Sequence, residues 1–363
     1  MTTLIIAEAG VNHNGSEKLA FDLVDAAVAA GVDIVKFQTF KAKDLVTVNA
    51  QQADYQVKNS EKVQTQYQML KELELSFDSH LAVKSYCEQQ GIEYLSTAFD
   101  SQSLLFLIET MKLTRLKIPS GEITNAPFVL EHAKSGCDLI VSTGMATLKE
   151  IEIALGIIAF GFLNKKSGNK PSLLACKSAY ESTQGQQLLK EKVTLLHCTT
   201  EYPAPFNEVN LNAMTTMRKV FNLPVGYSDH TAGIVIPVAA VAQKACVIEK
   251  HFTLSRQLEG PDHKASIEPN ELAQMVKDIR TVELALGNFE KQPTESELKN
   301  KAIARKSIVA KVPILKGEKL TSDNLAIMRP GDGLSPINYW KVVDTYAVKD
   351  FELGDLIYLS DLS

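Results

Sequence analysis

The sequence predicts a (β/α)8 barrel that is followed by a small β-rich domain. Between residues 4 and 253, eight apolar segments of strand length alternate with segments of helical periodicity. The span of this alternation, residues 4–287, matches the roughly 250 residues that such a barrel occupies. An open doubly wound sheet is the alternative, but the turn GVNHNG after the first strand lacks the GxGxxG spacing of a dinucleotide site.

Each predicted strand is an apolar run that ends in polar residues. This pattern is expected where parallel strands point their carboxyl ends at a ligand. Helical segments with one apolar face, suited to packing outside a barrel, include residues 16–30, 101–113, 148–160 and 268–286. The predicted strands are residues 4–10, 33–40, 93–99, 115–122, 139–145, 193–202, 225–231 and 246–253.

A chain of 363 residues is longer than one ordinary domain and predicts two. We expect the catalytic barrel at residues 1–287, a polar linker at 288–304 and a β-rich module with glycine and proline turns at 305–363. Two connections are long for an α/β unit. Residues 41–64, on the predicted catalytic face, could form a lid, whereas residues 161–192 lie on the opposite face and predict a structural role.

Composition predicts a cytoplasmic globular protein. Apolar residues make up 45% and charged residues 22% of the chain, close to the average for soluble domains. The net charge of −5 argues against a nucleic-acid partner, and no apolar stretch reaches the roughly 18 to 20 residues of a membrane span. The amino terminus does not resemble a signal peptide. The five cysteines form no CxxC pair, which predicts reduced thiols rather than disulfides or a zinc cluster.

Two histidines indicate a metal site. His230 and His251 end the seventh and eighth predicted strands, which are neighbours in a closed barrel. A lone histidine is more often a structural residue, but this pair lies near Asp229, Glu249 and Glu8. Together they predict a site for a divalent cation such as Mn²⁺, Zn²⁺ or Mg²⁺. Two protein nitrogens would leave positions open for water and a substrate oxygen.

Two lysines lie in strand segments that face the same mouth. Lys36 in IVKFQ and Lys117 in LKIPSGE have apolar neighbours, which favours an inward position. A buried lysine can form a Schiff base, or it can stay charged and hold a phosphate or carboxylate. The hydroxyls and glycines at other strand ends favour a phosphorylated carboxylate. These residues are Ser120, Ser142, Ser228, Thr97, Gly121 and Gly144.

Two carboxylates complete the predicted mouth. Glu8 and Glu122 end the first and fourth strands, where they could act as general acid or base or bind sugar hydroxyls; helix capping and salt bridges are the alternatives. Tyr202 and Asp262 follow the sixth and eighth strands and could orient a polyhydroxyl substrate. The remaining strand and loop histidines His13, His197 and His263 predict structural hydrogen bonds.

Ten segments, taken in order, resemble the sialic acid synthase family. They are IAEAGVNHNG, VKFQTF, STAFD, KIPSGEITN, VSTGM, HCTTEYPAP, GYSDHT, IEKHFT, GPDH and MRPGDG. They span nearly the whole chain. The resemblance implies a (β/α)8 barrel with a carboxyl-terminal antifreeze-like (SAF) domain, and an enzyme that joins phosphoenolpyruvate to an N-acetylated mannose-type sugar.

Within that family, HCTTEYPAPFNEVNL together with GPDHKAS is most similar to the N,N′-diacetyllegionaminic acid synthases of bacteria. Sialate synthases that resemble this chain carry His in place of Phe37 and Asn in place of Thr200. We expect both differences to make the sugar pocket less polar and to favour a 6-deoxy sugar. N-acetylneuraminate synthase and then pseudaminic acid synthase are the alternatives.

The resemblance also implies roles for individual residues. His230 and His251 would bind the metal, with Mn²⁺ favoured over Mg²⁺ or Co²⁺. Glu122, Lys117 and Glu8 would be catalytic, with Glu122 near the reacting carbons. Arg329 would reach the partner's active site in a domain-swapped homodimer and bind the acyl group of the sugar. Phosphoenolpyruvate would be held by Lys36, Thr97, Lys117, Ser120, Ser142 and Ser228, and the sugar by Glu8, Gln38, Tyr202 and Asp262.

Two departures from the family pattern and two rival functions stay open at this point. Residues 161–192 are longer than the family usually has there, and Asp344 stands where glycine is usual. A class I aldolase would use Lys36 or Lys117 to form an imine. A non-catalytic carbohydrate- or ice-binding protein would leave the polar groups at the barrel mouth without a function.

Overall fold

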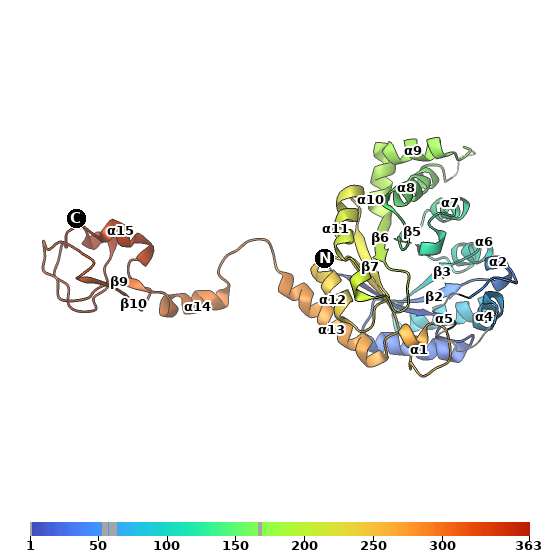
Figure 1. Cartoon of the computed structure of the whole chain (residues 1–363), viewed down its shortest axis with the longest axis horizontal. Coiled ribbons are helices and arrows are strands. Elements are labelled where there is room, and N and C mark those ends of the chain that lie inside the picture. The colour runs from blue at the N-terminus through green and yellow to red at the C-terminus, as the bar shows by residue number, and fades with distance from the viewer. Residues whose placement is uncertain (1, 53–56, 58–63, 166–168) are drawn as a thin grey trace. The chain divides into compact units, whose positions relative to one another are not determined.

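In the computed structural model the chain forms two compact units, Met1–Gly287 and Asn288–Ser363. The structure describes residues 2–52, 57, 64–165 and 169–363 (Figure 1). Part of the predicted lid at residues 41–64, namely residues 53–56 and 58–63, therefore lies outside the described residues.

The first unit is a closed barrel of eight parallel strands in sequence order, as predicted (Figure 1). Its first helix shows how the sequence sets an element boundary. The Ser16 side chain accepts a hydrogen bond from the Leu19 N–H at the start of α1 (Glu17–Ala30), and Gly31 ends the helix at φ 75°. The strands are β1 (Leu4–Gly10), β2 (Ile34–Thr39), β3 (Glu93–Ala98), β4 (Arg115–Ile118), β5 (Asp138–Ser142), β6 (Val193–Cys198), β7 (Val225–Asp229) and β8 (Val247–His251).

Several strands end earlier than the sequence predicts. β4 ends at Ile118 instead of residue 122, because Pro119 has no N–H for the ladder and Ser120–Glu122 forms a 3₁₀ turn. β6 ends at Cys198, and the following polar residues turn away from the sheet. Some polar residues at the mouth, such as Ser120 and Tyr202, thus belong to loops that begin where backbone pairing stops.

Helices surround the barrel and pack their apolar faces on the strands (Figure 1). The segment predicted as one helix at residues 101–113 is α6 followed by a π-helical turn at Phe106–Thr110. The main helices are α5 (Phe77–Gln90), α6 (Ser101–Leu105), α7 (Ala126–Ser135), α8 (Leu148–Leu163), α11 (Asn212–Phe221), α12 (Val235–Ala242) and α13 (Pro269–Leu286).

Two connections contain additional helices. α2 (Ala42–Leu45) and α4 (Gln66–Leu73) lie between β2 and α5, on the side of the barrel mouth. α9 (Leu173–Glu181) and α10 (Thr183–Lys192) form most of the long segment before β6 and pack against α8. Gly156 on α8 permits this contact, because an added Cβ would lie 3.1 Å from the Cys176 carbonyl oxygen.

The barrel interior has an apolar layer beneath a polar one. The polar layer is set by register, since Glu8 pairs with Lys36 on one side and with His251 on the other, and Ser228 pairs with Glu249. Two residues earlier on six of the eight strands, the inward side chains are hydrophobic. This apolar layer contains Ile6, Ile34, Leu95, Ile140, Leu196 and Val247.

The second unit is a small domain with its own core. Its sheet has two antiparallel strands, β9 (Ser307–Ala310) and β10 (Leu325–Met328), extended by isolated bridges. The predicted linker contains a helix, α14 (Glu295–Ala304), which belongs to this unit. Asp344 adopts φ 75°, a conformation that suits glycine and explains why glycine is usual there.

Within the described residues, no helix has the length and hydropathy needed to cross a membrane.

Candidate active site

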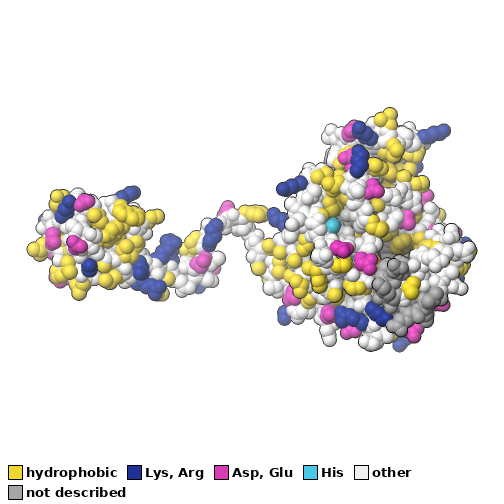
Figure 2. Space-filling model, in the orientation of Figure 1, with side chains coloured by type: hydrophobic (Ala, Val, Ile, Leu, Met, Phe, Trp, Pro, Cys, Tyr) yellow, Lys and Arg dark blue, Asp and Glu magenta, His cyan; other side chains and the backbone are white. Residues whose placement is uncertain are grey.

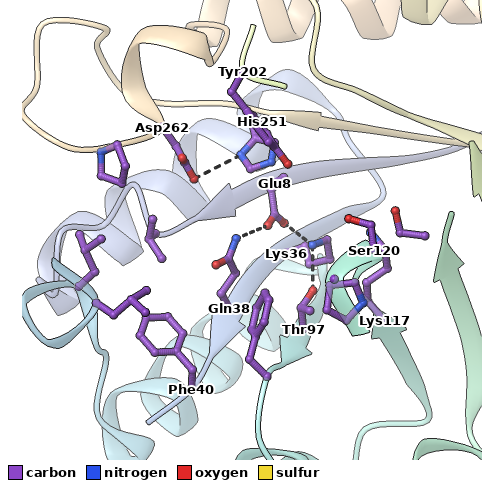
Figure 3. Close-up of a pocket in the computed structure, with 18 of the residues that line it drawn as sticks. Glu8, Lys36, Gln38, Phe40, Thr97, Lys117, Ser120, Tyr202, His251 and Asp262 are labelled. Carbon is purple, nitrogen blue, oxygen red and sulfur yellow. Dashed lines mark hydrogen bonds and ion pairs between the residues drawn. The ribbon is translucent and has the colours of Figure 1, made fainter. Parts of the chain in front are cut away.

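A cavity of about 280 Å³ lies at the carboxyl ends of the barrel strands. Nearly all of the predicted site residues of the barrel line it. Figure 3 shows Glu8 between Gln38 and Lys36, with His251 and Asp262 on one side and Lys117 and Ser120 on the other. The predicted residues in the lining are Glu8, Lys36, Gln38, Thr97, Lys117, Ser120, Ser142, Tyr202, Ser228, His230, His251 and Asp262.

Two lysines and two glutamates form a buried cluster on the floor of this cavity. Lys36 Nζ lies 2.6 Å from Glu8 Oε2 and 3.6 Å from Glu249 Oε2. Lys117 Nζ donates to both oxygens of Glu249, at 2.8 and 2.9 Å. Ser228 Oγ also donates to Glu249, at 2.8 Å. Each charged side chain is at most 4% exposed, so the cluster is shielded from bulk water.

Burial and neighbouring charges shift the pKa values of Glu8 and Glu249 in opposite directions. Burial raises the pKa of Glu8 to about 7, although Lys36 acts in the opposite direction. Burial would also raise the pKa of Glu249, but Lys117 and Lys36 outweigh it and hold that pKa well below its usual range. Burial alone would lower the pKa of Lys36, yet Glu249 and Glu8 raise it overall. Glu249 therefore stays ionised, whereas Glu8 can gain or lose a proton near neutral pH.

The two predicted metal-binding histidines lie side by side above this cluster. Their ring centroids are 5.5 Å apart, and Tyr202 packs against the His230 ring at 4.2 Å. Burial lowers the pKa of His230 to about 4. Burial and the neighbouring His230 lower the pKa of His251 well below its usual range. Both imidazoles are therefore neutral at pH 7, the form that ligates metals.

Hydroxyl groups on β3, β5 and the β4 loop surround the lysines. Lys36 Nζ donates to Thr97 Oγ1 at 3.0 Å. Ser120 Oγ lies 3.4 Å from Thr200 Oγ1, and Ser142 Oγ lies 3.1 Å from Cys198 Sγ. These short donors line the cavity around two ammonium groups, which suits an anion with several oxygens.

Gly144 is required by the close packing of this wall. A Cβ at this position would lie 2.7 Å from Cys198 Sγ and closer still to Thr200 Oγ1. The β5 loop can therefore approach β6 only without a side chain here.

Comparison with known proteins identifies the family. The model of the NeuB family matches residues 23–291, which is most of the chain. The chain belongs to the NeuB family. A SAF domain model matches residues 305–363, as predicted for the second unit.

Within the NeuB family, the chain is similar to two synthases of the same product. It is 46% identical to an N,N′-diacetyllegionaminic acid synthase of Campylobacter jejuni, covering 98% of both chains. It is 45% identical to one of Legionella pneumophila, covering 98% of this chain and 93% of the relative. A crystal structure of N-acetylneuraminic acid synthetase from Leptospira borgpetersenii has a TM-score of 0.66 and 32% identity, covering 83% of this chain and 90% of that one.

NeuB synthases are generally metal-dependent, and the histidine pair fits a metal ion. His230 Nδ1 donates to the Thr199 carbonyl oxygen at 2.6 Å, so Nε2 carries the lone pair, with Ser228 Oγ 3.4 Å away. His251 Nδ1 is buried and has no hydrogen-bond partner among the described residues, with Asp262 Oδ2 3.9 Å away. In the described ranges, no three His, Cys, Asp or Glu side chains form a metal cluster. The protein would thus supply two nitrogens, and further ligands would come from water or substrate.

Not every predicted residue lies at the cavity. Glu122 does not line it, and its carboxylate accepts a hydrogen bond from Asn125 Nδ2 at 2.7 Å. Arg329 belongs to the second unit, where its Nε donates to the Ala304 carbonyl oxygen at 3.1 Å. Their roles remain predictions.

Two expectations about neighbouring residues are wrong. Asp229 does not join the histidine pair, because it faces outward and pairs with Lys250 at 2.5 Å. Phe37 does not shape the sugar pocket, because it lies in the core between strands and helices and stacks on Tyr94 with centroids 5.6 Å apart. Both errors come from ignoring the alternation of side chains along a strand.

Glu249 makes more contacts in the site than the sequence predicts. It was expected only near the histidines, whereas it holds Lys117, Ser228 and, more distantly, Lys36. The signal was present in IEKHF, since Glu249 and His251 are two residues apart and must share one face of β8.

Proposed function

We propose that this protein is a nonulosonic acid synthase that makes N,N′-diacetyllegionaminic acid. The substrates are phosphoenolpyruvate and 2,4-diacetamido-2,4,6-trideoxymannose, and inorganic phosphate is the second product. The observation that carries the proposal is the similarity to two synthases of this acid along nearly the whole chain. The composition of the cavity agrees with it.

Phosphoenolpyruvate would bind at the lysine end of the cavity. Lys36 and Lys117 supply two positive charges, and Glu249, already bound by both lysines and Ser228, would hold them in place. The phosphate and carboxylate oxygens would accept hydrogen bonds from these ammonium groups and from nearby hydroxyls. We assign this role to Lys36, Lys117, Thr97, Ser120, Ser142 and Ser228.

The sugar would bind in its open-chain form above the phosphoenolpyruvate. Gln38 Nε2 donates to Glu8 Oε1 at 3.2 Å, so these two groups form one polar surface for hydroxyl and amide groups. Tyr202 and Asp262 would contact the sugar from the opposite side. His230 and His251 would hold a divalent cation, with Mn²⁺ favoured over Mg²⁺ and Co²⁺, which when bound makes the aldehyde carbon more electrophilic.

Bond formation joins the enol carbon of phosphoenolpyruvate to the aldehyde carbon of the sugar. The aldehyde oxygen gains a proton, and positive charge develops at the carbon that carries the phosphate. Water adds to that carbon and loses a proton, which balances the proton taken up by the aldehyde oxygen, and the hemiketal collapses with cleavage of the carbon–oxygen bond to phosphate. Glu8 can exchange protons near neutral pH because burial raises its pKa to about 7. We assign Lys117 to stabilising the phosphate. The resemblance assigns the developing cation to Glu122, which lies outside the lining of the cavity in this structure.

The same proposal includes the context of the enzyme. We propose a cytoplasmic catalytic barrel at residues 1–287, joined through residues 288–304 to the SAF domain at 305–363. On the resemblance alone, we also propose a domain-swapped homodimer in which Arg329 contacts the sugar bound by the partner. Light scattering of the purified chain would measure its mass, and a monomer would contradict the dimer.

A phosphate-release assay tests the reaction. We expect release with phosphoenolpyruvate and 2,4-diacetamido-2,4,6-trideoxymannose, slower release with N-acetylmannosamine or the pseudaminic acid precursor, and loss of release with a chelator. A strong preference for N-acetylmannosamine would make the protein an N-acetylneuraminate synthase. Trapping of a pyruvate adduct by borohydride, with no effect of the chelator, would instead indicate a class I aldolase.

A further inference from the structure

The cavity has a second end that differs chemically from the lysine end. It is formed by a hydrophobic cluster that is separate from the main core of the barrel. Figure 3 shows Phe40 on the side of Gln38 away from Lys117. The cluster contains the buried residues Val11, Phe40, Met69 and Leu73, with Leu45, Leu70 and Phe99 packed against them, and all seven line the cavity.

Three of these seven residues come from α4, a helix outside the regular barrel pattern. Met69, Leu70 and Leu73 lie on one face, as positions i, i+1 and i+4 of a helix do. The Thr65 capping box fixes the start of the helix. Just beyond its end, Glu74 holds it in place by pairing with Lys41 at 3.0 Å. The hydrophobic face is therefore positioned toward the cavity.

The chemistry of the condensation decides what part of the sugar reaches this cluster. The aldehyde carbon C1 must lie beside phosphoenolpyruvate, at the lysine end. In an open-chain hexose C6 is the carbon farthest from C1, so it extends toward the opposite end of the cavity. A methyl group at C6 would be buried favourably there, whereas a hydroxymethyl group would lose hydrogen bonds to water.

We infer that the hydrophobic cluster binds the C6 methyl group of the sugar, and that Leu70 and Leu45 are specificity-determining residues. This inference rests on the proposed function and adds the residues that select a 6-deoxy sugar. A hydrophobic pocket discriminates against an added hydroxyl by about a hundredfold. Gln66, also on α4 and in the lining, offers an amide to the acetamido group at C4.

The test compares two sugars that differ only at C6. They are 2,4-diacetamido-2,4,6-trideoxymannose and 2,4-diacetamido-2,4-dideoxymannose, and kcat/KM is measured for each by phosphate release. In the unaltered protein we expect a ratio of about 100 in favour of the 6-deoxy sugar. Leu70→Gln places an amide in the cluster, and we expect it to lower the ratio at least about fivefold, because the C6 hydroxyl gains a partner.

Matched variants separate specificity from general damage. Leu70→Met keeps the site hydrophobic and should keep the ratio. Leu130→Gln makes the same substitution at another partly buried leucine, on α7 and away from the cavity, and should also keep it. If Leu70→Gln does not fold, Leu45→Asn tests the same cluster from α2.

The outcomes distinguish this inference from the proposed function. A lowered ratio in Leu70→Gln or Leu45→Asn, with the ratio kept in Leu130→Gln, supports the inference. Normal phosphate release with equal rates for both sugars, or a ratio that Leu70→Gln and Leu45→Asn leave unchanged, overturns this inference alone. Absence of release with either sugar overturns the proposed function and the inference together.

Discussion

Glu249 and Lys250 are neighbours on β8, yet they serve two different buried charge clusters on opposite faces of the barrel wall. Glu249 faces the cavity and binds Lys117 and Ser228. Lys250 faces the helices, where it pairs with Asp229 at 2.5 Å and donates to the Thr231 carbonyl oxygen.

The two clusters differ in how completely they are satisfied. In the outer cluster, Asp229 also accepts hydrogen bonds from Tyr227 and Thr231, and the opposite charges balance. In the inner cluster, one glutamate has a pKa of about 7, so the two lysines are only partly balanced. Such a surplus of positive charge inside a cavity favours an anionic ligand, in agreement with the proposed binding of phosphoenolpyruvate, whereas the satisfied outer pair predicts a structural role. Substitutions at Lys117 and Lys250 test this difference directly.

The largest effect is expected from removing an inner lysine. Lys117→Ala should lower turnover by about a hundredfold to a thousandfold, because one well-placed electrostatic contact contributes roughly 3 to 4 kcal/mol to transition-state binding. The fold should persist, since Lys36 remains near Glu249 and water can enter the cavity. Phosphate release and circular dichroism measure the two properties, and near-normal turnover would contradict the assignment. His251→Ala should behave in the same way.

Breaking the outer pair should affect stability rather than chemistry. Lys250→Met leaves Asp229 buried without its counter-ion, and we expect a loss of roughly 3 to 5 kcal/mol in the free energy of unfolding. Combining it with Asp229→Asn should recover part of that loss. Denaturant titration gives these values, and Lys219→Met, on the exposed face of α11, is the control. Unchanged stability in Lys250→Met would show that the outer pair has no structural function.

A smaller effect is expected at the inner wall. Gly144→Ala would push Cys198 and Thr200 aside, and with them the hydroxyls of Ser142 and Ser120. Displacements of about 1 Å in such a site can cost about a hundredfold in rate. We expect kcat/KM for phosphoenolpyruvate to fall between about tenfold and a hundredfold. Gly121→Ala has open space around its Cβ and should change kcat/KM less; equal effects would argue against a tight wall.

The smallest effect concerns the stability of the fold in acid, through buried histidines on the helices outside the barrel. Burial lowers the pKa of His132 to about 4 and that of His80 to about 3. The unfolded chain therefore binds more protons between pH 6.5 and 4, so stability should fall as the pH falls through this range. Each histidine should cost roughly 1 to 2 kcal/mol at pH 5. His132→Gln should reduce the pH slope of the unfolding free energy; an unchanged slope would mean that His132 is protonated in the folded protein.

The sequence was sufficient for the barrel and for most of its mouth. Strand number, strand order and the convergence of Lys36, Lys117, His230 and His251 follow from apolar runs that end in polar residues. What failed was the face on which a residue lies, as Phe37 and Asp229 show. Their neighbours Lys36 and Ser228 point inward, so alternation alone would have placed both correctly.

The remaining features depend on packing that no local pattern reveals. The hydrophobic cluster brings together Val11, Phe40 and residues of α4. Its most distant members, Val11 and Leu73, are 62 positions apart along the chain. The balance between Glu8 and Glu249 depends on which lysine each one contacts. Neither distance nor burial can be read from one segment at a time.

The apolar layer beneath the charged residues has a kinetic consequence. Ile6, Ile34 and Leu95 close the barrel below Lys36, so both reactants share one entrance. The two lysines that would bind the anion are almost fully buried, whereas Gln38, Tyr202 and Asp262 above them are only partly covered. We therefore expect compulsory-order binding of the substrates, in which phosphoenolpyruvate binds first and the sugar then closes the cavity above it. Initial-velocity patterns with a dead-end sugar analogue would then be uncompetitive toward phosphoenolpyruvate.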